Sequence, residues 1–257
     1  MGVTTERATI AAIVIIVIIA ALYLYYKYDR DVQCPRKFFD VGATYPSLNG
    51  IRKYEPEIFA EYARFARHTE GNRGGPYDSW LDWPEKYLYN QSLTNDWKIF
   101  PIYAFGKWND MSAFPKLAEF LHQIDGLKMA LISRLGPHTA LVPHQGWGAY
   151  SNHVLRCHYG LVIPKHTSDN DGCYISVADT WERDVDGRLV TEERVQHLYK
   201  DWIIFDDSMV HWATNDTDEA RVVLIVDIER PSHVPDGVST VAFSEELVDV
   251  VRHFKAT

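Results

Sequence analysis

Between residues 128 and 228 the hydrophobic residues recur with a period of two, which is the period of a β-strand. The alternating segments are short, and turn residues separate them. Many short strands of this kind favour an antiparallel sandwich or jelly roll, so we expect a mainly β fold with flanking helices. The expected strands are residues 128–135, 140–143, 153–164, 173–177, 201–205 and 221–228.

Helical periodicity is confined to the flanks of this β region. Residues 55–70 carry an apolar stripe, and Pro56 suits the first turn of a helix there. Residues 114–125 form a second expected helix, with Ser112 as its cap and Gly126 as its stop. We expect irregular structure with short strands over 72–110, an extended hairpin or loop over 180–200, and a closing helix over 243–254.

Residues 8–26 are uncharged and rich in isoleucine and valine. As a helix they would span about 28 Å, close to the roughly 30 Å hydrocarbon core of a bilayer. The run is longer than the core of a usual signal peptide and ends in tyrosines, so a retained transmembrane anchor is favoured over a cleaved signal. We expect an anchor at residues 1–30, a linker or docking segment at 31–54 and the folded domain at 55–257.

The sequence leaves open which side of the membrane holds the domain. Basic residues follow the anchor between residues 27 and 37, and only Arg7 precedes it, which favours the cytosol by the positive-inside rule. Glycosylation triplets at Asn90 and Asn215 would have a meaning only in a secretory lumen.

Charge and cysteine content exclude two classes of protein. The net charge of -9 argues against nucleic acid as a partner, because phosphate binding requires a basic surface. The sparse cysteines, Cys34, Cys157 and Cys173, do not form a disulfide framework, and no Cys-x-x-Cys pair indicates structural zinc.

Two arginines fall on expected strands whose other buried positions are apolar. Alternation puts Arg156 and His158 on one face of the strand at 153–164, and Arg221 begins the apolar strand at 221–228. A buried charge without a partner is costly, so each arginine requires an anion. A dicarboxylate ligand would meet this requirement. The alternative is internal pairing with Asp206, Asp207 or Asp227.

His144 and His211 each stand at the end of a strand-like run. Histidines that are distant in sequence and meet on a β scaffold are a common arrangement for a transition metal. A triad carboxylate would lie two residues after the first histidine, where this chain has Gly146. We expect Asp206 and Asp207 to hold the turn before His211 or to orient a histidine, in preference to binding a metal.

Four motifs follow one another through this region. They are Pro-His-x-Gly at His144, Leu-Arg-x-His-x-Gly-Leu at residues 155–161, Ile-Phe-Asp-Asp-Ser at 204–208, and the run from Arg221 to Asp227. Together they resemble the catalytic domain of the aspartyl/asparaginyl β-hydroxylase family of iron(II)- and 2-oxoglutarate-dependent dioxygenases. The resemblance covers about residues 45–235, and it implies a double-stranded β-helix, the cupin-like form of the jelly roll.

The resemblance also implies a role for each matching residue. His144 and His211 would bind Fe²⁺, and Arg221 would bind the distal carboxylate of 2-oxoglutarate. Three further residues would complete the pocket of this co-substrate: Ser133, Arg156 and His158. The connection after His144 is longer than is usual in the family, and the polar insertion at 180–200 is a second departure.

The expected function is therefore hydroxylation of a C–H bond by a membrane-anchored enzyme that uses Fe²⁺, 2-oxoglutarate and O2. The family name implies an Asp or Asn side chain of a protein as the substrate. A lipid acyl chain is the alternative, since some relatives are membrane-bound lipid hydroxylases. Halogenation and a catalytically inactive binding module are further alternatives. Family analogy permits the endoplasmic reticulum lumen as well as the cytosol.

Overall fold

The computed structural model describes residues 15–23, 36–71, 80–89, 94, 96–165, 172–246 and 248. The chain divides into two compact units, Met1–Arg36 and Lys37–Thr257. In the first unit, residues 15–23 are helical. A search of the described ranges finds no helix with the length and apolar character that a membrane crossing requires. Most of the anchor expected at residues 8–26 lies outside these ranges, so the anchor stays a prediction.

The second unit is built on two antiparallel sheets. The larger is eight-stranded, in the order β1-β10-β7-β12-β5-β3-β2 with β4 paired to β3, and the smaller has the order β6-β11-β8-β9. This confirms the expected mainly β fold with helices and is consistent with a jelly roll. The strands are β1 (Phe38–Phe39), β2 (Leu81–Asp82), β3 (Trp97–Ala104), β4 (Lys107–Trp108), β5 (Leu127–Leu135), β6 (Thr139–Ala140), β7 (Val154–Val162), β8 (Cys173–Ala178), β9 (Glu193–Gln196), β10 (Trp202–Phe205), β11 (Val210–Asn215) and β12 (Arg221–Glu229).

Two strands of the core were not expected as such. Strand β3 is an eight-residue strand in the region where irregular structure with short strands was expected, and the register of its pairing with β5 shifts just after Pro101. Strand β11 carries His211 and mixes polar with apolar residues, so its sequence lacks a clean alternation. The strand expected at 140–143 is reduced to the two residues of β6.

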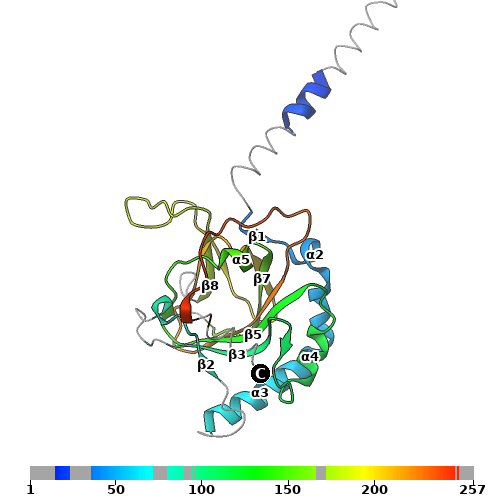
Figure 1. Ribbon diagram of the computed structural model, residues 1–257, viewed down its shortest axis with the longest axis vertical. Helices are drawn as coiled ribbons and strands as arrows, with labels where there is room; N and C mark the ends of the chain where they lie inside the picture. The colour runs from blue at the N-terminus through cyan, green and yellow to red at the C-terminus, as the bar shows by residue number, and fades with distance from the viewer. Residues whose placement is uncertain are drawn as a thin grey trace, which may run out of the picture. The chain divides into compact units, whose positions relative to one another are not determined.

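Helices cover one side of the larger sheet (Figure 1). The helix expected at 55–70 is confirmed as α3, whereas the helix expected at 114–125 ends earlier, and Gly126 adopts a positive φ of 74° in the turn that leads to β5. The helical elements are α2 (Val41–Thr44), η1 (Pro46–Lys53), α3 (Glu55–Gly71), η2 (Lys86–Leu88), α4 (Pro115–Leu121) and α5 (Gly148–Ser151).

The cap of α4 comes from another helix. Phe114 is its N-cap residue and makes no side-chain cap hydrogen bond, so the expected cap at Ser112 is wrong. The buried carboxylate of Glu61 on α3 accepts instead, from the backbone N–H of Lys116 (2.8 Å) and Leu117 (3.2 Å). This contact satisfies exposed donors of the first turn and ties the two helices together.

Alternation along β7 separates the core from the interior of the jelly roll. Leu155, Cys157, Tyr159 and Leu161 belong to the large hydrophobic cluster beneath the helices. Residues of the expected linker join the same cluster, with Leu48 and Ile51 of η1 fully buried, so this segment docks as part of the fold. Arg156 and His158 point the other way, between the two sheets, as the period of two predicted.

Candidate active site

His144 and His211 face each other across two neighbouring chain segments. Each backbone N–H donates to the carbonyl of the other residue, at 3.0 Å and 2.7 Å, so the two residues form a directly opposed antiparallel pair. Opposed residues of such a pair project to the same face. Their ring centroids consequently lie 4.4 Å apart.

The protons of both imidazoles are fixed by the main chain. His144 Nδ1 lies 2.7 Å from the carbonyl oxygen of Val142, and His211 Nδ1 lies 2.9 Å from that of Met209. A carbonyl only accepts, so Nδ1 donates in each ring and Nε2 keeps its lone pair. Burial lowers the pKa of His144 to about 3 and that of His211 to about 4, which keeps both rings neutral, as metal binding requires.

The described part of the chain offers the histidine pair no third side chain arranged as a ligand. Within the described ranges, no group of three or more His, Cys, Asp or Glu side chains is arranged to hold a metal ion. The space beside Gly146 is taken by Asp207, because a Cβ on that glycine would overlap the Asp207 carboxylate. Asp207 Oδ1 lies 3.3 Å from His211 Nε2. Two neutral imidazoles with open positions suit iron(II), which leaves room for a chelating co-substrate.

A cavity of about 340 Å³, here called the inner cavity, lies between the sheets next to the histidine pair. Arg221 at the start of β12 reaches it and is 2% exposed. Its Nε and Nη1 atoms are buried and have no hydrogen-bond partner among the described residues. Burial lowers the pKa of Arg221 to about 10, although the group stays protonated at neutral pH. A buried guanidinium without a partner is costly, and an anionic ligand would remove that cost.

Two further expected residues line the inner cavity with Arg221. Ser133 of β5 accepts a hydrogen bond from Trp97 Nε1 at 3.1 Å, which leaves its hydroxyl proton available. His158 Nδ1 lies 3.1 Å from Nε2 of His197, and His158 Nε2 is buried without a partner in the described part of the chain. When His197 donates to His158, the free Nε2 of His158 carries a proton that can be donated to a carboxylate.

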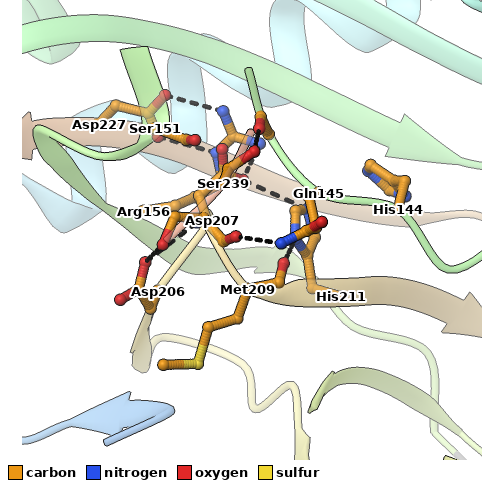
Figure 2. A network of polar contacts seen from close by, with 12 residues as sticks. His144, Gln145, Ser151, Arg156, Asp206, Asp207, Met209, His211, Asp227 and Ser239 are labelled. Carbon is orange, nitrogen blue, oxygen red and sulfur yellow. Dashed lines mark hydrogen bonds and ion pairs between the residues drawn. The ribbon is translucent and has the colours of Figure 1, made fainter. Parts of the chain in front are cut away.

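Arg156 lies among carboxylates (Figure 2), unlike Arg221. Its Nε and Nη2 atoms contact the two oxygens of Asp227 at 2.8 Å each, and its Nη1 lies 2.5 Å from Asp207 Oδ1. Burial opposes the charge of Arg156, but the two carboxylates overcome it and raise its pKa above the usual value. Arg156 is therefore paired with carboxylates of the protein itself, which is one of the two alternatives that the sequence left open. Among the described contacts it does not hold for Arg221.

Asp206 and Asp207 lie in the turn before His211 and make different contacts. Asp206 accepts from the backbone N–H and hydroxyl of Ser208 and pairs with both terminal nitrogens of Arg230, at 2.7 Å and 2.9 Å. Asp207 pairs with Arg156, and its Oδ1 lies 3.3 Å from His211 Nε2 without a hydrogen bond, because both atoms carry lone pairs. The contacts of Asp206 agree with the expected role in holding the turn before His211.

A second cavity, here called the outer cavity, is also lined by the histidine pair and holds about 540 Å³ of empty space, part of it open to solvent. Aromatic side chains dominate its lining, which includes Trp83, Tyr87, Trp147 and Tyr150. Sequence reasoning did not single out these residues, nor Glu85 and His197. The many aromatic residues between 72 and 110 were the available signal for Trp83 and Tyr87. His197 lies in a polar insertion with no recognisable pattern.

All six expected site residues thus gather around the two cavities. His144, His211 and Arg156 line both, and Ser133, His158 and Arg221 line the inner one. Iron(II) and 2-oxoglutarate fit this set, because two available Nε2 lone pairs stand beside unpaired buried donors that suit a carboxylate.

Known proteins resemble this chain in sequence. Residues 76–231 match the profile of the family described as Aspartyl/Asparaginyl beta-hydroxylase. The ornithine lipid ester-linked acyl 2-hydroxylase of Rhizobium tropici is 33% identical over 152 residues, which are 56% of this chain and 45% of that protein. The aspartyl/asparaginyl beta-hydroxylase of Homo sapiens is 32% identical over 150 residues, which are 54% of this chain and 17% of that protein. The matched region thus spans less than half the length of either relative.

Among solved structures, a Pseudomonas putida prolyl-4-hydroxylase aligns with a TM-score of 0.44 and 13% identity, covering 68% of this chain and 86% of that one. The family match covers more than half of this chain and includes all four motifs. The chain therefore belongs to the aspartyl/asparaginyl β-hydroxylase family, whose enzymes are dioxygenases that use iron(II), 2-oxoglutarate and O2.

Proposed function

We propose that this protein hydroxylates a C–H bond with iron(II) held by His144 and His211 and with 2-oxoglutarate bound by Arg221. The observation that carries the proposal is the pair of unpartnered nitrogens on fully buried Arg221, beside two neutral imidazoles with available Nε2 atoms. When bound, iron(II) would couple the oxidative decarboxylation of 2-oxoglutarate to succinate and CO2, which takes up one oxygen atom of O2, to insertion of the other oxygen atom into an unactivated C–H bond.

The chain's own residues position these groups and exclude water. Arg221 would form charge-assisted hydrogen bonds to the distal carboxylate of 2-oxoglutarate, with Ser133 and His158 as further donors. Arg156 lines both cavities while Asp207 and Asp227 engage its charge. We propose it as a wall of the co-substrate pocket that also orients Asp207.

Family names suggest two substrate classes for this chain, a peptidyl Asp or Asn side chain and a lipid acyl chain. The Homo sapiens relative carries the first in its name and the Rhizobium tropici relative the second. A membrane anchor at residues 8–26 would place either substrate near a bilayer. An inactive binding module is disfavoured, because it would have no need for neutral facing histidines together with an unpaired buried arginine.

The test is iron-dependent turnover of 2-oxoglutarate to succinate by the purified full chain in detergent. We expect His211→Ala to abolish the turnover, since one imidazole cannot hold the metal. His138→Ala is the matched control, because His138 is 45% exposed and pairs only with Asp218. Absence of iron-dependent turnover and of 2-oxoglutarate binding in the unaltered protein would reject the hydroxylase, and full activity in His211→Ala would reject the ligand assignment.

A further inference from the structure

The outer cavity has an unusual balance of charge for a family named after acidic substrates. Arg156 is the only lysine or arginine among the described residues that line it. Its three nitrogens are all engaged by Asp207 and Asp227. A carboxylate on a substrate would therefore find no available cation there, and Asp207 would repel it.

Glu85 adds a second carboxylate to the same lining, at the start of η2. It is 3% exposed and accepts from Trp83 Nε1 at 3.2 Å and from the Tyr87 hydroxyl at 2.9 Å. Both donors are neutral, and no ion pair to Glu85 occurs among the described residues within 4.0 Å. A buried carboxylate without a cation is costly, so a cation supplied by a ligand would complete it.

Two aromatic side chains contact this carboxylate, and one of them, Trp83, belongs to a larger aromatic cluster. Trp83 stacks on Trp97 with centroids 4.6 Å apart, and Tyr89 meets Trp97 edge-on at 5.8 Å. Ring faces attract an ammonium group, and a carboxylate among them adds direct charge. Burial raises the pKa of Tyr87 to about 12, with further contributions from the hydrogen bond and charge of Glu85 and from the charge of Glu246. The wall near Glu85 is thus both aromatic and negative.

Apolar and aromatic residues also line the outer cavity, and some of them are shared with a neighbouring hollow. Met129, Trp147 and Tyr150 line both the outer cavity and an adjoining hollow of about 210 Å³, which Phe105 also lines. Lys128 at this hollow is paired with Glu229 at 2.8 Å. The outer cavity therefore combines a negative aromatic part at Glu85 with an apolar part at Met129 and Trp147, and the histidine pair lines it as well.

We infer that the outer cavity selects an aliphatic substrate that carries an ammonium group, with Glu85 and the rings of Trp83 and Tyr87 binding the ammonium. The aliphatic part lies over His144 and His211 and extends toward Met129 and Trp147. This inference rests on the proposed function and specifies its substrate class. It disfavours the acidic side chain that the family name implies.

Three probes of equal length separate charge from hydrophobicity: hexylamine, hexanol and hexanoate. Their binding to the full chain, loaded with iron(II) and 2-oxoglutarate without oxygen, is followed by the fluorescence of the cavity tryptophans. We expect hexylamine to bind at least about 10-fold more tightly than hexanol, as a charge-assisted contact supplies, and hexanoate to bind most weakly. With oxygen admitted, hexylamine should raise succinate formation above its basal rate.

Glu85→Gln keeps the size and most hydrogen bonds of the side chain and removes its charge. We expect this variant to bind hexylamine and hexanol with affinities within about threefold of each other. Glu119→Gln is the matched control, because Glu119 is exposed on α4 and pairs with Lys116; it should keep the preference of the unaltered protein. Should Glu85→Gln fail to fold, the comparison of the three probes on the unaltered protein decides the question.

Hexanoate binding as tight as that of hexylamine, or an unchanged amine preference in folded Glu85→Gln, would overturn the inference. Basal succinate formation without any probe separates this result from failure of the hydroxylase itself. Retained basal turnover with no amine preference rejects only the substrate class, whereas loss of iron-dependent turnover in the unaltered protein rejects both.

Discussion

Arg221 offers a test in which stability and binding should move in opposite directions. Its guanidinium is buried with two nitrogens unpaired among the described residues. Burial lowers its pKa from 12.5 to about 10. Since each pKa unit corresponds to about 1.4 kcal/mol, keeping this charge in the folded protein without its co-substrate costs about 3 kcal/mol.

Arg221→Met keeps most of the aliphatic stem and removes the charge. Some packing is lost, so we expect the free energy of unfolding without co-substrate to rise by about 2 kcal/mol. For a domain of this size, that gain corresponds to a rise in Tm of roughly 5 °C. Thermal unfolding of the metal-free protein, followed by near-ultraviolet circular dichroism, measures it.

Addition of 2-oxoglutarate should reverse the order of the two proteins. With iron(II) present and the co-substrate at 100 times its Kd, the unaltered protein gains about 2.7 kcal/mol. Arg221→Met should gain nothing, because its main contact with the distal carboxylate is gone. Arg134→Met serves as the control, since Arg134 is half-buried and already paired with Asp96. A variant that is less stable without co-substrate, yet still stabilised by it, would refute the reasoning.

Three further outcomes are expected. Gly146→Ala should destabilise the fold and lower iron affinity, because its methyl group would displace the Asp207 carboxylate. Gly50→Ala is the control and should be tolerated, because its methyl group would make an ordinary van der Waals contact with the Phe120 ring at 3.9 Å; calorimetry and metal titration compare the two variants. Asp227→Asn should lower the free energy of unfolding in urea by about 3 kcal/mol, because it leaves the buried charge of Arg156 short of a partner, and adding Arg156→Met should restore part of that loss. An unchanged urea midpoint in Asp227→Asn would contradict this. His211 and His144 have pKa values of about 4 and 3 in the folded protein, whereas in the unfolded chain they bind protons below about pH 6.5. The free energy of unfolding of the metal-free protein should therefore fall as the pH falls through that window, by up to about 1.4 kcal/mol per pH unit for each histidine. A urea midpoint that does not change from pH 7 to 5 would contradict this.

The strand period of two predicted the interior face of β7 and most of the larger sheet, because a half-buried strand must alternate. It did not predict β11, although this strand carries His211. There the ring is held by the carbonyl of Met209 and by the backbone pairing with His144. Neither contact requires a particular side chain nearby, so the strand's sequence carries little trace of them.

The glutamate of the outer cavity escaped sequence reasoning for a related reason. Glu85 stands in a segment without periodicity, next to Trp83 and Tyr87. An acidic residue among aromatic ones is ordinary on a surface, where water solvates it. Only its burial, which depends on packing against distant β3, turns it into a charge that requires a partner.

The two arginines look alike in the sequence, and the register of the sheet decides between them. Arg156 of β7 lies directly across from Asp227 of β12, so its charge is met inside the protein. Arg221 shares a strand and a face with Asp227, but six residues of extended chain put about 20 Å between them. Its own cross-strand neighbour is Leu135, which offers no anion. The pairing of β7 with β12 thus neutralises Arg156, which lines both cavities, and leaves Arg221 in the inner cavity available to an anionic ligand. That division favours a dicarboxylate in the inner cavity and disfavours an acidic group in the outer one.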